Sequence, residues 1–295
     1  MAIPHENPED FDIYLRLITS YAYRIVGSIS EAEDIAQEAM VRLWNQSGSE
    51  EIKNPKAWLF KVVTRQSLDH LKSARVQREM YVGPWLPEPF ISNPLTAGDQ
   101  VELDESLSMA LMVVLERLNP AEKTTFILHD IFNFSHREIS ETLGVSEANS
   151  RKLFSRAKEK IKHKNARFKP SLDEHSRLTQ TFLEALKCGN LNNLIALFSE
   201  EVTLYSDSGG KAPAARKILK DAEFIANFLI KVITKSLSNE KYSTHEVWFN
   251  GSPGVLITEN QIPITAFNFV VFNGKILTIH ALRNPEKLKF FQDVS

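Results

Sequence analysis

The stretch that most constrains the fold is residues 135–164, whose pattern predicts two helices joined by a tight turn. Ile139 and Leu143 give the first helix an apolar face, and Gly144 supplies the turn. Ser146 is a suitable N-cap for the second helix. The second helix has an apolar side of its own, made by Leu153, Phe154, Ala157 and Ile161. This pattern is typical of a helix-turn-helix.

The second of these helices carries a dense positive charge. Residues 151–169 contain nine basic residues and one acidic residue, a net charge of +8. A helix of this kind can enter a major groove and contact the flanking phosphates. A charge run alone is as typical of an ordinary solvated helix face, but its combination with the glycine turn and the apolar positions favours DNA binding.

Composition excludes several other classes of protein. A chain of 295 residues with 43% hydrophobic and 24% charged residues predicts two or three globular domains. The single cysteine, Cys188, excludes an internal disulfide and agrees with a reducing cytosol. Residues 1–10 do not resemble a signal peptide, and the apolar run 262–272 is too short to span a bilayer. We therefore expect a soluble cytoplasmic protein without a membrane partner.

The small net charge of the chain hides an uneven distribution. Residues 1–51 have a balance of −7, residues 52–79 a balance of +5, and residues 171–295 are neutral. Such a distribution indicates different partners for different segments.

The pattern of apolar residues predicts a helical first half and a mixed second half. We expect helices over residues 11–26, 30–44, 55–79, 104–118, 120–130, 172–187, 191–198 and 222–235. Strands are expected over residues 202–206, 241–250, 255–259, 265–272 and 276–282, with a hairpin turn at Asn273-Gly274. The predicted fold class is multidomain, with two all-α domains followed by an α+β domain.

Residues 81–100 form a linker that contains four prolines, which disfavour a regular helix. Trp85, Leu86, Phe90 and Ile91 alternate with these prolines. Apolar residues in a stiff segment indicate that the linker docks on a neighbouring surface.

Residues 1–170 resemble the extracytoplasmic-function sigma factors. The resemblance depends on Glu31-Ala-Glu-Asp-Ile-Ala-Gln-Glu38, Trp58-Leu-Phe60, Asn119-Pro-Ala-Glu122 and the turn Leu143-Gly-Val-Ser146, in this order. Three further motifs resemble a subgroup with a C-terminal SnoaL-like domain: Trp85-Leu-Pro-Glu-Pro89, Asp207-Ser-Gly-Gly-Lys211 and Asn284-Pro-Glu-Lys-Leu288. The resemblance implies sigma region 2 over residues 1–80, a linker over 81–103, region 4 over 104–169 and a SnoaL-like cone barrel over 171–295.

The resemblance also implies which residues bind the transcription machinery. Asp34, Gln37 and Glu38, with the apolar anchors Leu43 and Trp44, are expected to contact the β and β′ subunits of RNA polymerase core. The −10 promoter element is expected to contact Lys53, Lys56, Lys61, Arg65 and Lys72.

The basic helix is expected to bind the −35 element. Its N-terminal positions, Asn149, Arg151, Lys152 and Ser155, are placed to reach base edges. Arg156, Lys158 and Lys162 are expected to contact phosphates.

The SnoaL-like domain is expected to regulate the sigma factor in cis, without a separate anti-sigma factor. The residues implied in this contact are Trp85, Leu86, Pro87, Glu88, Pro89, Asp207, Gly209, Gly210, Lys211, Asn284, Pro285, Glu286, Lys287 and Leu288. A small apolar ligand, held by Phe224, Phe228, Trp248 and Phe267, could act on this contact.

The alternative is a helix-turn-helix regulator fused to an enzyme or ligand-binding domain of the ketosteroid isomerase and polyketide cyclase type. Its acid–base candidates are Tyr205, Asp207, His245 and His280. Single Tyr and His residues on strands are more often structural, so we expect no enzyme. The histidines and the cysteine have no metal-ligand spacing, and no metal or cofactor is expected.

Overall fold

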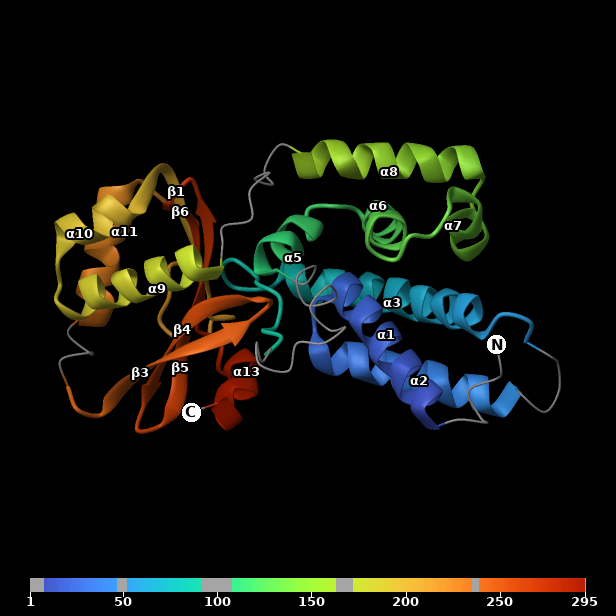
Figure 1. Cartoon of the computed structure of the whole chain (residues 1–295), viewed down its shortest axis with the longest axis horizontal. Helices are drawn as coiled ribbons and strands as arrows, with labels where there is room; N and C mark the ends of the chain where they lie inside the picture. Colours follow the sequence, from blue (N-terminus) through green and yellow to red (C-terminus); the bar gives the residue numbers. More distant parts are fainter. Residues whose placement is uncertain (1–7, 47–51, 92–107, 163–171, 235–238, 295) are drawn as a thin grey trace. The chain divides into compact units, whose positions relative to one another are not determined.

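A computed structural model describes residues 8–46, 52–91, 108–162, 172–234 and 239–294 (Figure 1). The chain divides into two compact units. One contains residues Met1–Glu79 and Leu111–Asn165, and the other contains Met80–Ala110 and Ala166–Ser295.

The first unit is helical, as predicted. Its elements are α1 (Pro8–Val26), α2 (Ile29–Gln46), α3 (Pro55–Glu79), α5 (Met109–Leu115), α6 (Pro120–Phe126), η2 (Ile127–Ile131), α7 (His136–Leu143) and α8 (Glu147–Lys162). The helix predicted over 104–118 is described only from residue 108 onward. Helix α1 ends at Gly27, which lies in the left-handed region. At the start of α2 the side chain of Ser28, and not that of Ser30, accepts the backbone N–H of Glu31.

Two capping boxes fix the start of the helices in the second half of this unit. The side chains of Asn119 and Glu122 cap each other's backbone at the start of α6, and Ser135 and Glu138 do the same at α7. After Phe126 the chain continues as a π-helical turn, η2, which the sequence does not distinguish from an α-helix.

Aromatic side chains join the two helical halves of the first unit. Tyr21 of α1 and Phe60 of α3 both lie against Phe132. Their ring centroids are 5.3 and 5.1 Å, respectively, from the centroid of Phe132. Phe134 adds a second contact to Phe60 at 4.8 Å. Burial raises the pKa of Tyr21, whose hydroxyl lies 2.6 Å from Oγ1 of Thr64. These rings form one core from segments that are distant in the chain.

The second unit is an α+β domain, as predicted, and we call its sheet and covering helices the cone. Its helices are α9 (Leu172–Lys187), α10 (Leu191–Leu197), α11 (Ala222–Leu229), η3 (Ile230–Thr234), α13 (Pro285–Leu288) and η4 (Lys289–Val294). Its strands are β1 (Phe198–Asp207), β2 (Leu219–Lys220), β3 (Tyr242–Phe249), β4 (Ser252–Glu259), β5 (Ile262–Phe272) and β6 (Lys275–Leu282).

The six strands form one sheet in the order β2-β1-β6-β5-β4-β3. Strands β1 and β6 are parallel, and the other neighbours are antiparallel. The two-residue strand β2 and the short helix α13 were not predicted. Helix α9 lies across the sheet (Figure 1) and packs Phe182 against Phe267 and Phe269 of β5.

Three consecutive tight turns connect β3 to β6. Each has an asparagine in the left-handed region: Asn250, Asn260 and Asn273. This conformation matches the twist of two-residue hairpins and is tolerated by asparagine. The sequence predicted only the turn at Asn273-Gly274.

Candidate functional site

The basic helix α8 presents one open polar face. Asn149, Arg151, Lys152, Ser155 and Arg156 are all exposed on it. Arg151 forms an ion pair with Glu147 one turn earlier, with 2.5 Å between Nη2 and Oε1. The side chain of Lys162 lies outside what the structure describes. The opposite face is packed, since Leu153, Ala157 and Ile161 are buried.

Two other cations of α8 bind to acidic residues of region 4 itself. Lys160 Nζ lies 2.6 Å from Oε2 of Glu122, whose side chain is buried. Lys158 Nζ lies 3.7 Å from Oδ1 of Asp130 and over the ring of Phe154. The positive field of α8 is therefore partly neutralised inside the protein, which the charge count could not show.

Helix α3 and the residues before it present a second set of cations. Lys53, Lys56, Lys61, Arg65 and Lys72 are exposed. The hydrogen bond from Lys72, 2.7 Å from Oδ1 of Asp69, lowers the pKa of that carboxyl group. Glu138 of α7 also has a lowered pKa, first because of its hydrogen bonds with Ser135 and then because of the charge of Lys56.

Helix α2 carries exposed acidic and apolar side chains on the same surface. Asp34, Gln37 and Glu38 are exposed, and Trp44 is 61% exposed. Leu43 is only 1% exposed and packs in the core, so its prediction as an anchor for a partner is wrong. Val41, which the sequence analysis did not include in this surface, is 58% exposed. It takes the place of Leu43 as the exposed apolar residue near Trp44.

The docked part of the linker, residues 81–91, is held on the cone by a buried carboxylate. Asp207 ends β1 and is fully buried. Its Oδ1 accepts the hydroxyl proton of Tyr81 at 2.5 Å, and its Oδ2 accepts the backbone N–H of Leu86 at 2.8 Å. One side chain of the cone thus accepts hydrogen bonds from two residues of the linker.

A buried lysine of the cone also binds the linker. Lys287 of α13 forms an ion pair with Asp207, with 2.8 Å between Nζ and Oδ2, and donates to the carbonyl of Leu86. Its ammonium lies 4.3 Å from the ring centroid of Trp85. Both backbone groups of Leu86 are therefore bound by a buried charge pair, and the Leu86 side chain is itself buried.

The rest of the predicted motifs surround this pair. Asn284 caps α13 and donates from Nδ2 to the Tyr81 hydroxyl at 3.0 Å. Burial, followed by the charge of Asp207, raises the pKa of Tyr81. Gly209 and Gly210 leave room for the linker, because an added Cβ would lie 3.0 Å from the Tyr81 hydroxyl and 3.1 Å from Val82.

The outer residues of the motifs are less involved. Lys211 forms an ion pair with Glu286, both on the surface, which joins the glycine-containing loop to α13. Leu288, Pro87 and Pro89 are buried, Glu88 is half-buried, and Pro285 is exposed at the first position of α13.

The acid–base candidates of the alternative hypothesis do not form a catalytic site. Tyr205 and His280 are opposite each other on β1 and β6, but Asp207 is occupied by the linker and Lys287. His245 lies on the outermost strand, β3. Burial lowers the pKa of His280 to about 3, so this side chain is neutral at pH 7.

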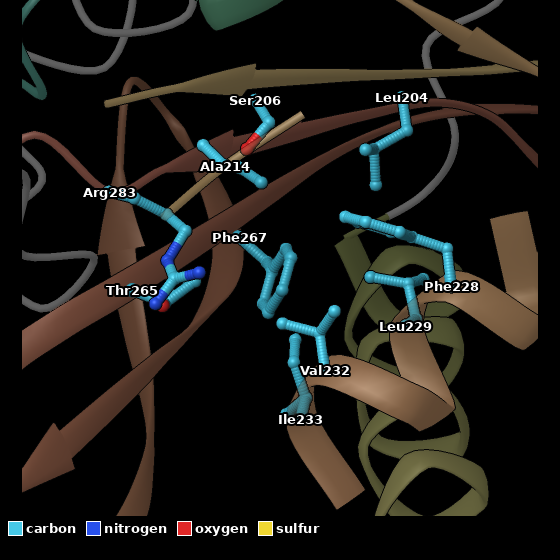
Figure 2. A pocket seen from close by; sticks show the side chains of 11 residues that line it. Leu204, Ser206, Ala214, Phe228, Leu229, Val232, Ile233, Thr265, Phe267 and Arg283 are labelled. Carbon is cyan, nitrogen blue, oxygen red and sulfur yellow. The ribbon is translucent and has the colours of Figure 1, made fainter. Parts of the chain in front are cut away.

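The interior of the cone offers little room for a ligand at the place where one was expected. A cavity of about 20 Å³ lies between the sheet and α11–η3, space for about one water molecule. Figure 2 shows Phe228, Val232 and Phe267 around it, with the guanidinium of Arg283 at one end. Phe224 is 57% exposed, and neither Phe224 nor Trp248 lines this cavity. The expectation that these two residues hold a ligand there is therefore wrong.

Two kinds of site are absent from the residues that the structure describes. No helix among them has the length and apolar character needed to cross a membrane. They also contain no group of three or more His, Cys, Asp or Glu side chains arranged to hold a metal ion.

Comparisons with known proteins agree with the geometry. Residues 11–76 match the family model of sigma-70 region 2, and residues 108–161 match that of sigma-70 region 4. The chain is 34% identical to the ECF RNA polymerase sigma factor SigJ of Mycobacterium tuberculosis, over 94% of this chain and 92% of SigJ. It is 30% identical to the probable ECF sigma factor SigI of the same species, over 92% and 91%.

The similarity extends to the three-dimensional structure. The crystal structure of M. tuberculosis SigJ matches with a TM-score of 0.77 at 29% identity, over 96% of this chain and 98% of SigJ. Two sigma regions followed by a SnoaL-like cone are thus shared over nearly the whole chain. This protein belongs to the extracytoplasmic-function RNA polymerase sigma factors, which initiate transcription and are not enzymes.

Proposed function

We propose that this protein directs RNA polymerase core to promoters and that the cone restrains it in cis by holding the linker between regions 2 and 4. The observation that carries the proposal is the buried pair Asp207–Lys287, which binds both backbone groups of Leu86. A chain segment that connects two DNA-binding regions cannot extend while it is bound in this way.

Polymerase core would bind on α2. The exposed Asp34, Gln37 and Glu38 supply negative charge, and Trp44 with Val41 supplies exposed apolar surface at the end of the same helix. Aromatic and apolar anchors within a polar rim are typical of binding surfaces. The partners would be the β and β′ subunits, in the cytoplasm.

Promoter DNA would bind on α3 and α8. Lys53, Lys56, Lys61 and Arg65 would contact the −10 element, with Lys72 weakened by its pairing to Asp69. Asn149, Arg151, Lys152 and Ser155 would reach bases of the −35 element, with Arg156, Lys158 and Lys162 on phosphates. No separate anti-sigma factor would be needed to keep the protein inactive.

The test is run-off transcription with purified polymerase core and the variant Lys287→Met. Methionine keeps much of the volume but leaves Asp207 as a buried carboxylate without its cation, which costs about 3–5 kcal/mol. Lys289→Met is the matched control, because Lys289 lies two residues further along the chain, is exposed, and places its ammonium over the ring of Phe290.

We expect Lys287→Met to transcribe at least several-fold more than the wild-type protein at limiting polymerase, and Lys289→Met to behave as wild type. Circular dichroism shows whether each variant is folded. Equal transcription by all three folded proteins would exclude restraint through this pair. Failure of the wild-type protein to stimulate core at any promoter would exclude the sigma activity itself.

A further inference from the structure

The cone holds the linker at a second place, which none of the sequence motifs contains. This place is Asn250, at the turn between β3 and β4. Asn250 is fully buried, although the asparagines of the next two hairpin turns, Asn260 and Asn273, are exposed. Turns normally lie on the surface, so the burial of Asn250 indicates a specific contact.

Asn250 binds both backbone groups of one linker residue. Its Oδ1 accepts the backbone N–H of Phe90 at 3.1 Å, and its own backbone N–H donates to the carbonyl of Phe90 at 2.7 Å. The next linker residue, Ile91, forms an antiparallel bridge with Phe249. Since β3 is the outermost strand, the end of the docked linker is added to the edge of the sheet.

The two places recognise the linker in the same way. The pair Asp207–Lys287 binds the N–H and the carbonyl of Leu86. Asn250 binds the same two groups of Phe90, four residues further along. Contacts of this kind depend on an extended backbone more than on the side chain of the bound residue. The cone therefore presents a surface for an extended peptide, with two main-chain binding sites.

The residues between the two sites make this peptide stiff. Pro87 and Pro89 have a fixed φ and no backbone N–H, so they favour an extended chain and need no acceptor. A stiff spacer keeps Phe90 close to Asn250 once Leu86 is bound, and little conformational entropy is lost when the second contact forms. Each site should therefore strengthen the other.

We propose that the cone binds residues 86–90 as a peptide ligand at two coupled main-chain sites, of which Asn250 is the second. This inference rests on the proposed restraint in cis and adds that the restraint needs both sites. Loss of the Asn250 side chain loosens Leu86 as well as Phe90, although Asp207 and Lys287 are unchanged.

Hydrogen exchange of the full-length protein tests the coupling with the variant Asn250→Gly. Glycine adopts the same left-handed backbone, with φ of 51°, but lacks the acceptor for Phe90. We expect the Phe90 amide to exchange about tenfold faster and the Leu86 amide about threefold faster. Asn273→Gly, an identical change at an exposed Asn-Gly turn, should leave both amides at their wild-type rates. Amides of β4 report that the cone remains folded.

A change in the linker tests the same inference without altering the cone. Phe90→Pro removes the N–H that Asn250 binds, whereas Phe90→Leu removes the ring and keeps the N–H. We expect faster exchange of the Leu86 amide in Phe90→Pro than in Phe90→Leu.

Run-off transcription at limiting polymerase core then measures the effect on the restraint. Transcription should rise about threefold in Asn250→Gly and in Phe90→Pro, because each variant weakens docking at both sites. It should stay at the wild-type level in Asn273→Gly.

The outcomes separate this inference from the proposed function. Unchanged exchange at Phe90 in Asn250→Gly overturns the second site, whatever Lys287→Met does to transcription. Faster exchange at Phe90 with unchanged exchange at Leu86 overturns the coupling. Equal exchange at Leu86 in the two Phe90 variants overturns recognition through the main chain.

Two results concern transcription. Exchange as expected with unchanged transcription by Asn250→Gly overturns the claim that the restraint needs both sites. Exchange as expected in a protein that never stimulates polymerase supports the two sites and overturns the sigma activity.

Discussion

Lys160 Nζ lies 2.6 Å from Oε2 of Glu122, a carboxylate that is buried beneath the basic helix and also caps α6. The motif Asn119-Pro-Ala-Glu122 therefore has a structural role: it starts one helix and holds the next. A lysine within the basic run of α8 is therefore paired with a buried carboxylate of region 4, although its own side chain is half-exposed.

Lys160→Met should destabilise region 4 without a specific effect on promoter choice. The substitution leaves the Glu122 carboxylate buried without its cation, and the half-exposed position of Lys160 limits the loss to about 1–3 kcal/mol. Denaturant unfolding measures this free energy. Arg156→Met, an exposed change on the same helix, should leave it within about 0.5 kcal/mol of wild type.

Lys152→Ala and Arg156→Ala should affect −35 binding in different ways. Lys152 is at the end of α8 that we expect in the major groove, so its loss should relax sequence choice by about 1–3 kcal/mol at one base pair. Arg156→Ala should weaken binding to all sequences alike and reduce the salt slope by about one. Fluorescence titration of polymerase-bound protein over a salt series distinguishes them, and identical profiles would contradict both assignments.

The cone should lose stability as the pH falls below about 6.5. Burial lowers the pKa of His280 to about 3 and that of His175 to about 4, while an unfolded histidine titrates near 6.5. The unfolded chain therefore takes up protons that the folded chain excludes. The free energy of unfolding is highest well above pH 6.5, and at pH 5.5 each buried histidine has lowered it by about 1.4 kcal/mol.

His280→Asn should reduce this pH dependence by about half, measured as the slope of unfolding free energy against pH and not as absolute stability. His245→Gln, on the edge strand β3, leaves both buried histidines in place and should keep the wild-type slope. An unchanged slope in His280→Asn would show that this side chain does not titrate on unfolding.

Phe132→Ala should loosen the contact between regions 2 and 4. Phe132 packs on Tyr21 and Phe60 and lies 5.5 Å from the guanidinium carbon of Arg24, which is fully buried. Loss of this ring should cost about 2–4 kcal/mol. Energy transfer between dyes on α2 and α8 should report a broader distance distribution. Phe224→Ala, an exposed position of the cone, should change nothing.

Local patterns predicted the elements of the fold, but contacts between distant residues decided much of the site. The glycine turn, the N-cap Ser146 and the apolar side of α8 are all encoded within a few residues, and the helix-turn-helix was predicted correctly. The burial of Leu43 could not be read from the sequence, because adjacent residues on an amphipathic helix divide between the core and solvent according to tertiary packing.

Asn250 shows the same limit more sharply. An Asn-Gly pair predicts a hairpin turn, and two such pairs, Asn250-Gly251 and Asn273-Gly274, occur in the cone. Only the register of β3 and the path of the linker decide which one binds Phe90. The prediction of the residues that line the cavity was partly wrong for a related reason. Phe224 and Phe228 lie one turn apart on the same side of α11, yet Phe224 is 57% exposed and only Phe228 lines the cavity, because tertiary packing decides which turn of the helix is covered.

The order in which the strands can pair has a consequence for newly made protein. The hairpins from β3 to β6 join neighbouring segments, whereas the parallel pairing of β1 with β6 joins Thr203 to Thr278, 75 positions away. Distant pairings form late, and N-terminal domains fold first during synthesis. Asp207 and Lys287, which are 80 positions apart, meet only when this last pairing is complete. We therefore expect each nascent chain to pass through an interval in which both sigma regions are folded but the proposed restraint in cis has not yet formed.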